Sequence, residues 1–199
     1  MLYTESDSVF DSIKFEGDDF MVKPKIFVLV GSFRRDSLNQ KLFGFFKEEA
    51  GDAMAFDRFD VSSLPHFSED IENSPPAEAS DLKKRAAASD GVLVVTPEYN
   101  RSFPGVLKNA LDWGSRPYGQ SVWGGKPAGL IGTSPGAIGT FGAQSQIRQT
   151  LAFLDLRLMA RPEFYFAFPK ELDNGKLPAS ARDFLKSYVE AFIGWVTKK

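Results

Sequence analysis

The chain carries few side chains that can serve as catalytic groups. It contains no cysteine, and its single histidine, His66, follows Leu64-Pro65 in a polar connection. Disulfides, thiolate nucleophiles and cysteine metal sites are therefore excluded, and a histidine-rich metal site cannot form within one chain. His66 itself is best interpreted as an ordinary loop residue. If the protein is an enzyme, we expect its chemistry to come from a bound cofactor.

Residues 31–39 form a polar stretch with the chemistry to bind an anion. Their sequence, Gly-Ser-Phe-Arg-Arg-Asp-Ser-Leu-Asn, follows an apolar run and opens a helical pattern. Backbone amides at a helix N-terminus favour a phosphate, and guanidinium groups can add a charged fork. The side chains available are Ser32, Ser37, Asn39 and either Arg34 or Arg35. The stretch matches neither the Walker loop nor the Gly-x-Gly-x-x-Gly turn. The alternative is a tight turn in which Ser37 caps the helix and the arginines are solvated.

Two further stretches follow apolar runs in the same way. Residues 96–105 read Thr-Pro-Glu-Tyr-Asn-Arg-Ser-Phe-Pro-Gly and form a stiff, polar link between a strand and a helix. They bind a ligand or, alternatively, are a connection in which Tyr99 packs and Glu98 is solvated. Residues 132–140 are rich in glycine, which lets backbone approach a flat ligand closely. A flexible loop is the alternative there.

Alternating strand and helix patterns position these three stretches. Strands are predicted at residues 25–31, 55–61, 91–95, 126–132 and 158–168, and helices at 37–50, 77–90, 104–113, 142–154 and 179–196. This alternation predicts an α/β fold with a doubly wound parallel sheet, and the flavodoxin-like strand order 2-1-3-4-5 is our first choice. All three polar stretches then lie at the carboxyl edge of the sheet, where such folds bind ligands. Their convergence favours a binding site.

Length and composition predict one soluble globular domain. The 199 residues include 43% hydrophobic and 25% charged residues, and the net charge of −2 argues against phosphate-mediated binding to nucleic acid. No run is long enough to cross a bilayer and no secretory signal is recognisable, so we expect a cytoplasmic protein without membrane partners. Residues 1–22 are acidic and lack a clean period, which indicates a mobile or loosely docked leader before a folded unit at 23–199.

Several motifs together resemble the NADPH-dependent FMN reductase family, which includes the bacterial NAD(P)H:quinone reductases also described as chromate reductases. They are Gly31-Ser-x-Arg-x-x-Ser-x-Asn39, Pro97-Glu-Tyr-Asn100, Ser102-x-Pro-Gly105, Leu107-Lys-Asn-Ala110, Asp112-Trp113, Gly132-Thr-Ser-Pro-Gly-Ala-Ile-Gly-Thr140, Ile147-Arg148, Leu154-Asp155 and Arg161-Pro-Glu-Phe164. The resemblance extends from Lys25 to about residue 190. The Pro-Glu-Tyr-Asn element with its Lys-Asn-Ala helix is the most specific part.

The resemblance implies an FMN bound without covalent attachment. By match, its phosphate would be held by Ser32, Arg34, Ser37 and Asn39. Its isoalloxazine would contact Pro97, Glu98, Tyr99 and Asn100, largely through backbone groups, while Ser134 and Gly136 would close the other side. Leu38 and Arg101 complete the expected cofactor-binding set. Neither a catalytic side chain nor a metal is expected. Two departures from the family stand out: Arg101 replaces an often aromatic or small residue, and Phe141-Gly142 replaces a small residue followed by arginine.

The expected reaction is hydride transfer from NAD(P)H to FMN and onward to a quinone, free flavin or similar acceptor, including possible chromate reduction. The main alternative is a flavodoxin-like one-electron carrier without NAD(P)H turnover. A flavin-free receiver-type domain is disfavoured, because the first strand ends without the acidic pair of a phospho-acceptor site. The resemblance also implies a homodimer or homotetramer. The helix 104–113, with Tyr118 and Trp123, is either a subunit contact or part of the core.

Overall fold

The structure is a computed structural model that describes residues 23–170 and 172–198. The predicted leader, residues 1–22, lies outside this range. The strands are β1 (Lys25–Val30), β2 (Ala55–Phe59), β3 (Gly91–Val95), β4 (Pro127–Ser134), β5 (Arg157–Leu158) and β6 (Tyr165–Ala167). The helices are α1 (Leu38–Ala50), α2 (Ala77–Ala87), α3 (Gly105–Ser115), α4 (Phe141–Phe153) and α5 (Ala179–Thr197), with short 3-10 turns at η1 (Gly51–Ala53), η2 (Val61–Ser63) and η3 (Glu69–Ile71).

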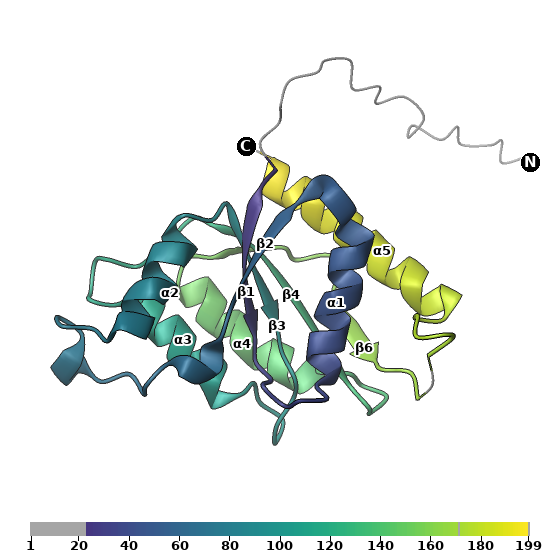
Figure 1. The fold of residues 1–199 in the computed structure, drawn as a ribbon, viewed down its shortest axis with the longest axis horizontal. Coiled ribbons are helices and arrows are strands. Elements are labelled where there is room, and N and C mark those ends of the chain that lie inside the picture. The colour runs from purple at the N-terminus through teal and green to yellow at the C-terminus, as the bar shows by residue number, and fades with distance from the viewer. Residues whose placement is uncertain (1–22, 171, 199) are drawn as a thin grey trace, which may run out of the picture.

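The strands form one parallel sheet in the order β2-β1-β3-β4-β5, which confirms the predicted flavodoxin-like topology (Figure 1). Strands β1 and β3 are buried along nearly their whole length, as expected of a sheet covered on both faces. One apolar core packs α1 and α5 against the sheet, and a second packs α2, α3 and α4 against the other face.

The predicted fifth strand, residues 158–168, is wrong in detail because it is broken in two. Both β5 and β6 pair with β4, with Leu158 opposite Ala128 and Tyr165 opposite Gly132. Six residues of the chain therefore pass three residues of β4 and must leave the ladder. Pro162 lies in this excursion, where it has no amide hydrogen for strand pairing.

Tyr188 of α5 occupies the gap left by the broken strand. The Leu130 amide of β4 donates to the Tyr188 hydroxyl at 2.8 Å, and the hydroxyl donates to the Leu130 carbonyl at 3.1 Å. The ring is fully buried, and this burial raises the pKa of Tyr188 well above its usual range. A neutral side chain thus replaces the missing strand's hydrogen bonds.

The two tryptophans of the α3 region belong to the core, so the proposed contact surface cannot include them. Trp113 and Trp123 are 1% and 0% exposed. Gly114 makes room for Trp123, because a Cβ there would lie 2.2 Å from the Trp123 ring. Tyr118 is 91% exposed and stays available for a contact. Among the described residues, no helix is long and apolar enough to cross a membrane.

Candidate functional site at the carboxyl edge of the sheet

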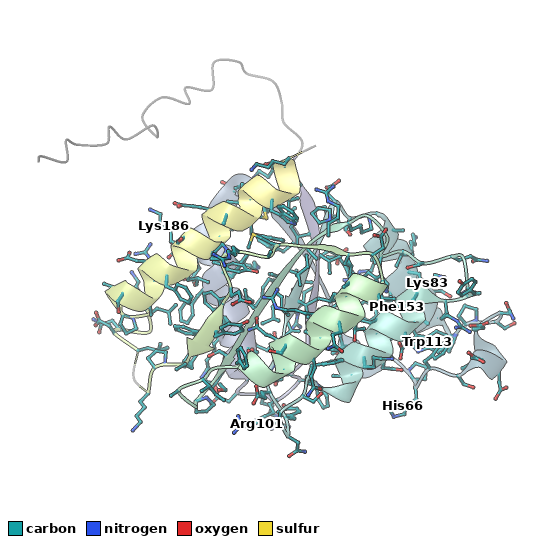
Figure 2. The ribbon with its side chains drawn as sticks, turned by 180° about the vertical axis from the view of Figure 1, so that it is seen from behind. His66, Lys83, Arg101, Trp113, Phe153 and Lys186 are labelled. Atoms are coloured by element: carbon teal, nitrogen blue, oxygen red, sulfur yellow. The ribbon has the colours of Figure 1, made fainter. Side chains whose placement is uncertain are left out.

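The ends of β1, β3 and β4 bring the three predicted stretches to one edge. The Gly31 amide donates to the Val95 carbonyl and the Thr96 amide donates to the Ile131 carbonyl, both at 2.9 Å. We call residues 31–37 the first loop, 96–104 the second loop and 135–140 the third loop. Figure 2 shows Arg101 of the second loop projecting at this edge, while Lys186 lies on α5 away from it.

The first loop presents hydrogen-bond donors without partners. Within the described chain, its backbone amides from Ser32 to Asp36 donate no hydrogen bond, and Arg34 and Arg35 have no ion-pair partner. Ser37 is buried and caps α1, accepting from the Gln40 amide at 3.2 Å. Amides, hydroxyls and guanidinium groups are the donors that a phosphate requires. The donor set of the first loop therefore fits the phosphate end of a nucleotide.

Asn39 fastens the start of α1 to β4. Its side-chain amide donates to the Thr133 carbonyl at 2.9 Å, and the Thr133 amide donates back to Asn39 Oδ1 at 3.0 Å. Both residues are buried. Asn39 therefore has a positioning role, in addition to the phosphate contact that was predicted for it. Leu38, beside it, packs against the core of α1 and α5.

Gln40 was not among the predicted site residues, although it supports the first loop. Its Nε2 donates to the Ser32 carbonyl at 3.0 Å, and its Oε1 accepts from Arg58 at 2.5 Å. A signal for it exists in the sequence, since Ser37-x-x-Gln40 has the spacing of a capping box.

The second loop contains a tight two-residue turn. The amides of Tyr99 and Ser102 each donate to the other's carbonyl, at 2.9 and 3.0 Å, and the two central residues have positive φ angles: Asn100 at 51° and Arg101 at 66°. Such a turn has the backbone of a hairpin. It leaves the side chains of Tyr99 and Asn100 exposed at the edge of the sheet. Pro97, which precedes it, is buried.

Glu98 joins the second loop to α4. Its side chain is only 8% exposed, and its carboxylate accepts from the Ala143 amide at 3.1 Å and pairs with Arg101 at 3.0 Å. A carboxylate at a helix N-terminus is stabilised by the unpaired amides there. Gly142 allows this approach, because a Cβ would come within 3.1 Å of Glu98 and of the Arg101 carbonyl. The Glu98 carboxylate is thus bound to the start of α4. The glycine at position 142, where the resemblance led us to expect arginine, is explained by this close packing.

Gln146 adds a second link between this loop and α4. Its Nε2 donates to the Arg101 carbonyl at 3.1 Å, and the Ser102 hydroxyl donates to its Oε1 at 2.6 Å. Sequence reasoning missed Gln146, because nothing local connects residues 44 positions apart.

The third loop is held by the side chain of Ser134, the last residue of β4. The Ser134 hydroxyl donates to the Gly139 carbonyl at 2.6 Å and accepts from the Gly136 amide at 3.2 Å. Gly139 has a φ of 60°, and a Cβ there would lie 2.6 Å from the Phe166 nitrogen. The two residues predicted to contact the flavin here therefore have different roles. Ser134 shapes the loop, and Gly136 is exposed to a ligand.

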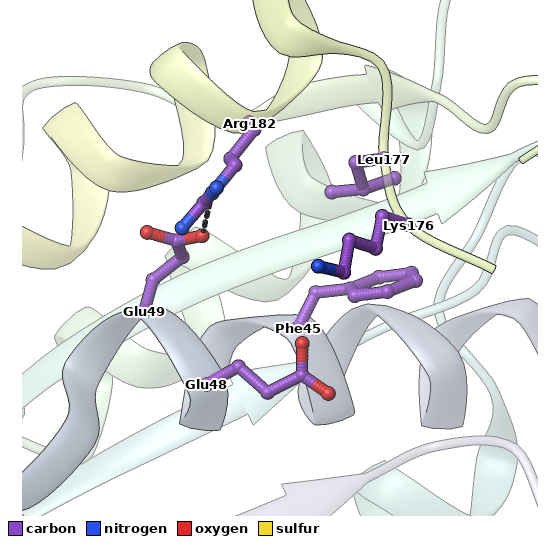
Figure 3. A pocket seen from close by; sticks show the side chains of 6 residues that line it. All are labelled: Phe45, Glu48, Glu49, Lys176, Leu177 and Arg182. Atoms are coloured by element: carbon purple, nitrogen blue, oxygen red, sulfur yellow. Dashed lines mark hydrogen bonds and ion pairs between the residues drawn. The ribbon is translucent and has the colours of Figure 1, made fainter. Parts of the chain in front are cut away.

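A separate hollow lies between α1 and the start of α5, far from this edge (Figure 3). It measures about 130 Å³ and includes an ion pair between Glu49 and Arg182. Glu49 stands at the opposite end of α1 from Asn39, roughly 15 Å along the helix. The hollow is therefore no part of the candidate site. The described residues contain no group of three His, Cys, Asp or Glu side chains able to hold a metal ion.

Comparisons with known proteins agree on one family. A family model described as NADPH-dependent FMN reductase matches residues 24–171. A 2-hydroxy-1,4-benzoquinone reductase from Burkholderia sp. is 49% identical over 175 residues, covering 86% of this chain and 96% of the relative. A quinone reductase from Pseudomonas putida is 47% identical over 172 residues, covering 85% and 92%. The structure of FerB, a flavoenzyme NAD(P)H:(acceptor) oxidoreductase from Paracoccus denitrificans, has a TM-score of 0.83 at 40% identity, covering 87% of this chain and 97% of FerB.

Proposed function

The chain belongs to the NADPH-dependent FMN reductase family, and on that premise we propose that it is an FMN-dependent NAD(P)H:quinone oxidoreductase. The proposal rests on one observation: the first loop, whose hydrogen-bond donors have no partners, lies at the same sheet edge as the exposed second and third loops. The relatives that share close to half of their residues with this chain carry quinone reductase names, which supports the same activity.

FMN is the cofactor, and we propose that the three loops bind it without a covalent bond. The first loop would hold its phosphate through backbone amides, Ser32, Ser37 and Arg34, with the Asn39 side chain as a further contact. The second and third loops would border the ring through Pro97–Asn100 and Gly136. When bound, FMN supplies the two-electron chemistry, taking hydride from NAD(P)H and reducing the acceptor.

The role of the protein is to bind and orient FMN and to leave the flavin ring accessible to its substrates. Glu98 is engaged by α4 and Arg101, so it is not free to act as a base. Exposed backbone donors beside the ring can stabilise negative charge that develops there. Tyr99 and Ile138 are 47% and 54% exposed, which leaves an open apolar edge for a planar nicotinamide or quinone.

We propose quinones as the main electron acceptors, with free flavin and chromate as alternative acceptors. The test is steady-state NADH and NADPH oxidation by the FMN-loaded protein with benzoquinones, FMN and chromate, under anaerobic conditions. We expect FMN-dependent turnover that is fastest with quinones. FMN binding without NAD(P)H oxidation would favour the one-electron carrier instead, and failure to bind FMN would overturn both.

We also propose a homo-oligomer that uses the exposed side of α3 and α4. Phe153 lies on α4 (Figure 2) and is 88% exposed. It borders a cleft of about 500 Å³ whose other lining residues include Phe67, Lys108 and Asp112. An aromatic ring that is almost wholly exposed at the border of a cleft offers apolar surface that a second copy can bury. Light scattering should show a dimer or tetramer that Phe153→Asp dissociates. A monomeric parent protein would remove the proposal.

A further inference from the structure

A polar cleft of about 430 Å³ lies beside the first loop, on its β2 side. It is lined by Phe33, Arg34, Arg35, Gln40, Arg58, Asp60 and Ser62. The cleft thus collects side chains from the first loop, from α1 and from the end of β2. None of the contacts proposed above for the FMN ring uses these β2 residues.

The lining is positively charged although the chain as a whole is not. It holds three arginines and one aspartate, in a chain whose net charge is −2. The aspartate, Asp60, accepts from the amide and hydroxyl of Ser62 through its Oδ1, at 3.0 and 2.7 Å. These hydrogen bonds, with a smaller contribution from nearby Arg58, lower the pKa of Asp60, so it stays ionised and offsets one of the three positive charges. The lining keeps a net positive charge that favours an anion.

Arg58 is held in place at this cleft. Its guanidinium donates to Gln40 Oε1, and Gln40 in turn donates to the Ser32 carbonyl of the first loop. Arg35 comes from the first loop and has no hydrogen-bond or ion-pair partner within the described chain. The two residues belong to adjacent segments and line one cleft, so their guanidinium groups can converge on a single anion.

We propose that this cleft binds the 2′-phosphate of NADPH through Arg58 and Arg35. The inference rests on the proposed function and adds to it a preference for NADPH over NADH. The first loop already offers a separate set of backbone donors for the FMN phosphate. Arginine suits a 2′-phosphate because its guanidinium can donate two parallel hydrogen bonds to phosphate oxygens. The exposed ring of Phe33, 64% exposed, offers the adenine a stacking surface beside it.

The test compares probes that differ only in this phosphate. Calorimetry measures binding of 2′,5′-ADP and 5′-AMP to the FMN-loaded protein, and steady-state kinetics compare NADPH with NADH. Arg58→Gln and Arg35→Gln should each weaken 2′,5′-ADP relative to 5′-AMP by roughly tenfold, as expected for one charged hydrogen bond. The KM for NADPH should rise relative to that for NADH by a similar factor. Lys186→Gln, which removes one positive charge from distant α5, should change neither ratio.

Two results would overturn the inference. Equal binding of 2′,5′-ADP and 5′-AMP to the parent protein would show that the cleft does not read this phosphate. Loss of FMN in both arginine variants, with unchanged discrimination between the probes, would assign the arginines to the FMN phosphate instead. If the parent protein oxidised neither nucleotide, the proposed function would fail, but the calorimetric comparison would still decide the role of the cleft.

Discussion

Two asparagines, Asn39 and Asn109, each bind one backbone N–H and one backbone carbonyl of another segment. Asn39 exchanges two hydrogen bonds with Thr133 beneath the first loop. Asn109 of α3 accepts from the Phe67 amide at 2.8 Å and donates to the Pro65 carbonyl at 2.9 Å. Only the first of these pairs touches the candidate site, so the second provides a matched control.

Asn39→Asp is expected to destabilise the protein and weaken FMN binding together. The new carboxylate cannot donate to the Thr133 carbonyl and places a charge in a buried position, at a cost of about 2 kcal/mol. Urea unfolding and FMN fluorescence titration measure the two effects. Asn109→Asp should also lower the unfolding free energy, by about 1 kcal/mol, but leave FMN affinity unchanged. Equal FMN affinity in both variants would contradict the positioning role of Asn39.

Arg101 shows how a single residue can be understood only through its backbone. Its φ of 66° is a conformation that glycine adopts freely and other residues adopt at a cost. Arg101→Gly and Arg101→Ala both remove the ion pair with Glu98, which is exposed on the arginine side and contributes little. The alanine variant should therefore be less stable than the glycine variant by about 1 kcal/mol. Identical melting behaviour of the two would mean that the turn does not persist in solution.

At the site, the sequence predicts which loops converge but not how they are fastened. The proline- and glycine-rich strand ends mark the second and third loops, because those residue types are needed locally. The contacts of Glu98 with Ala143 and of Asn39 with Thr133 join residues 45 and 94 positions apart. Such contacts depend on the packed sheet and leave no local pattern.

At the scale of elements, α5 completes the sheet that β5 and β6 leave open. Tyr188→Phe should lower the unfolding free energy by about 2 kcal/mol, because the Leu130 amide and carbonyl lose their buried partner. Tyr118→Phe provides the control, since Tyr118 is 91% exposed and its substitution should change stability by less than about 0.5 kcal/mol. A similar effect of both substitutions would argue against the bridging role.

The broken fifth strand also marks the limit of prediction for the elements. The apolar residues from Leu158 to Phe168 have the composition of one strand, and the other four strands match their predicted positions closely. What divides the fifth strand is Pro162 together with a hydroxyl that arrives from α5, 26 residues later. Pro162 can be recognised in the sequence, but the Tyr188 hydroxyl that takes over the hydrogen bonds of the missing strand cannot.

At the scale of the whole molecule, Asp57 connects three elements and makes stability depend on pH. Its carboxylate accepts from Arg85 of α2 and pairs with Lys25 of β1 at 2.9 Å. The Arg85 hydrogen bond, with help from Lys25, lowers the pKa of Asp57 below 3.8. A lowered pKa in the folded state means that the unfolded state binds more protons in acid.

The contribution of Asp57 should therefore be complete above about pH 5 and disappear as the pH falls through 3.8 towards the lowered value. We expect Asp57→Asn to lose about 1 kcal/mol at neutral pH and to reduce the acid dependence of urea unfolding. Asp52→Asn removes a fully exposed partner of Lys23, whose ion pair is screened by solvent, and should reduce the acid dependence less than Asp57→Asn does. The interpretation fails if Asp57→Asn and the parent protein lose stability in parallel between pH 5 and 3.

The strand order has a consequence for aggregation. Among the described strands, β2 forms one border of the sheet, and Asp57 and Arg58 place charges on it. The opposite border consists of β5 and β6, which are two and three residues long. Charged or very short border strands are poor templates for pairing with another chain. Two copies are therefore discouraged from pairing strand to strand at these borders, and we expect the proposed homo-oligomer to form through helices and loops.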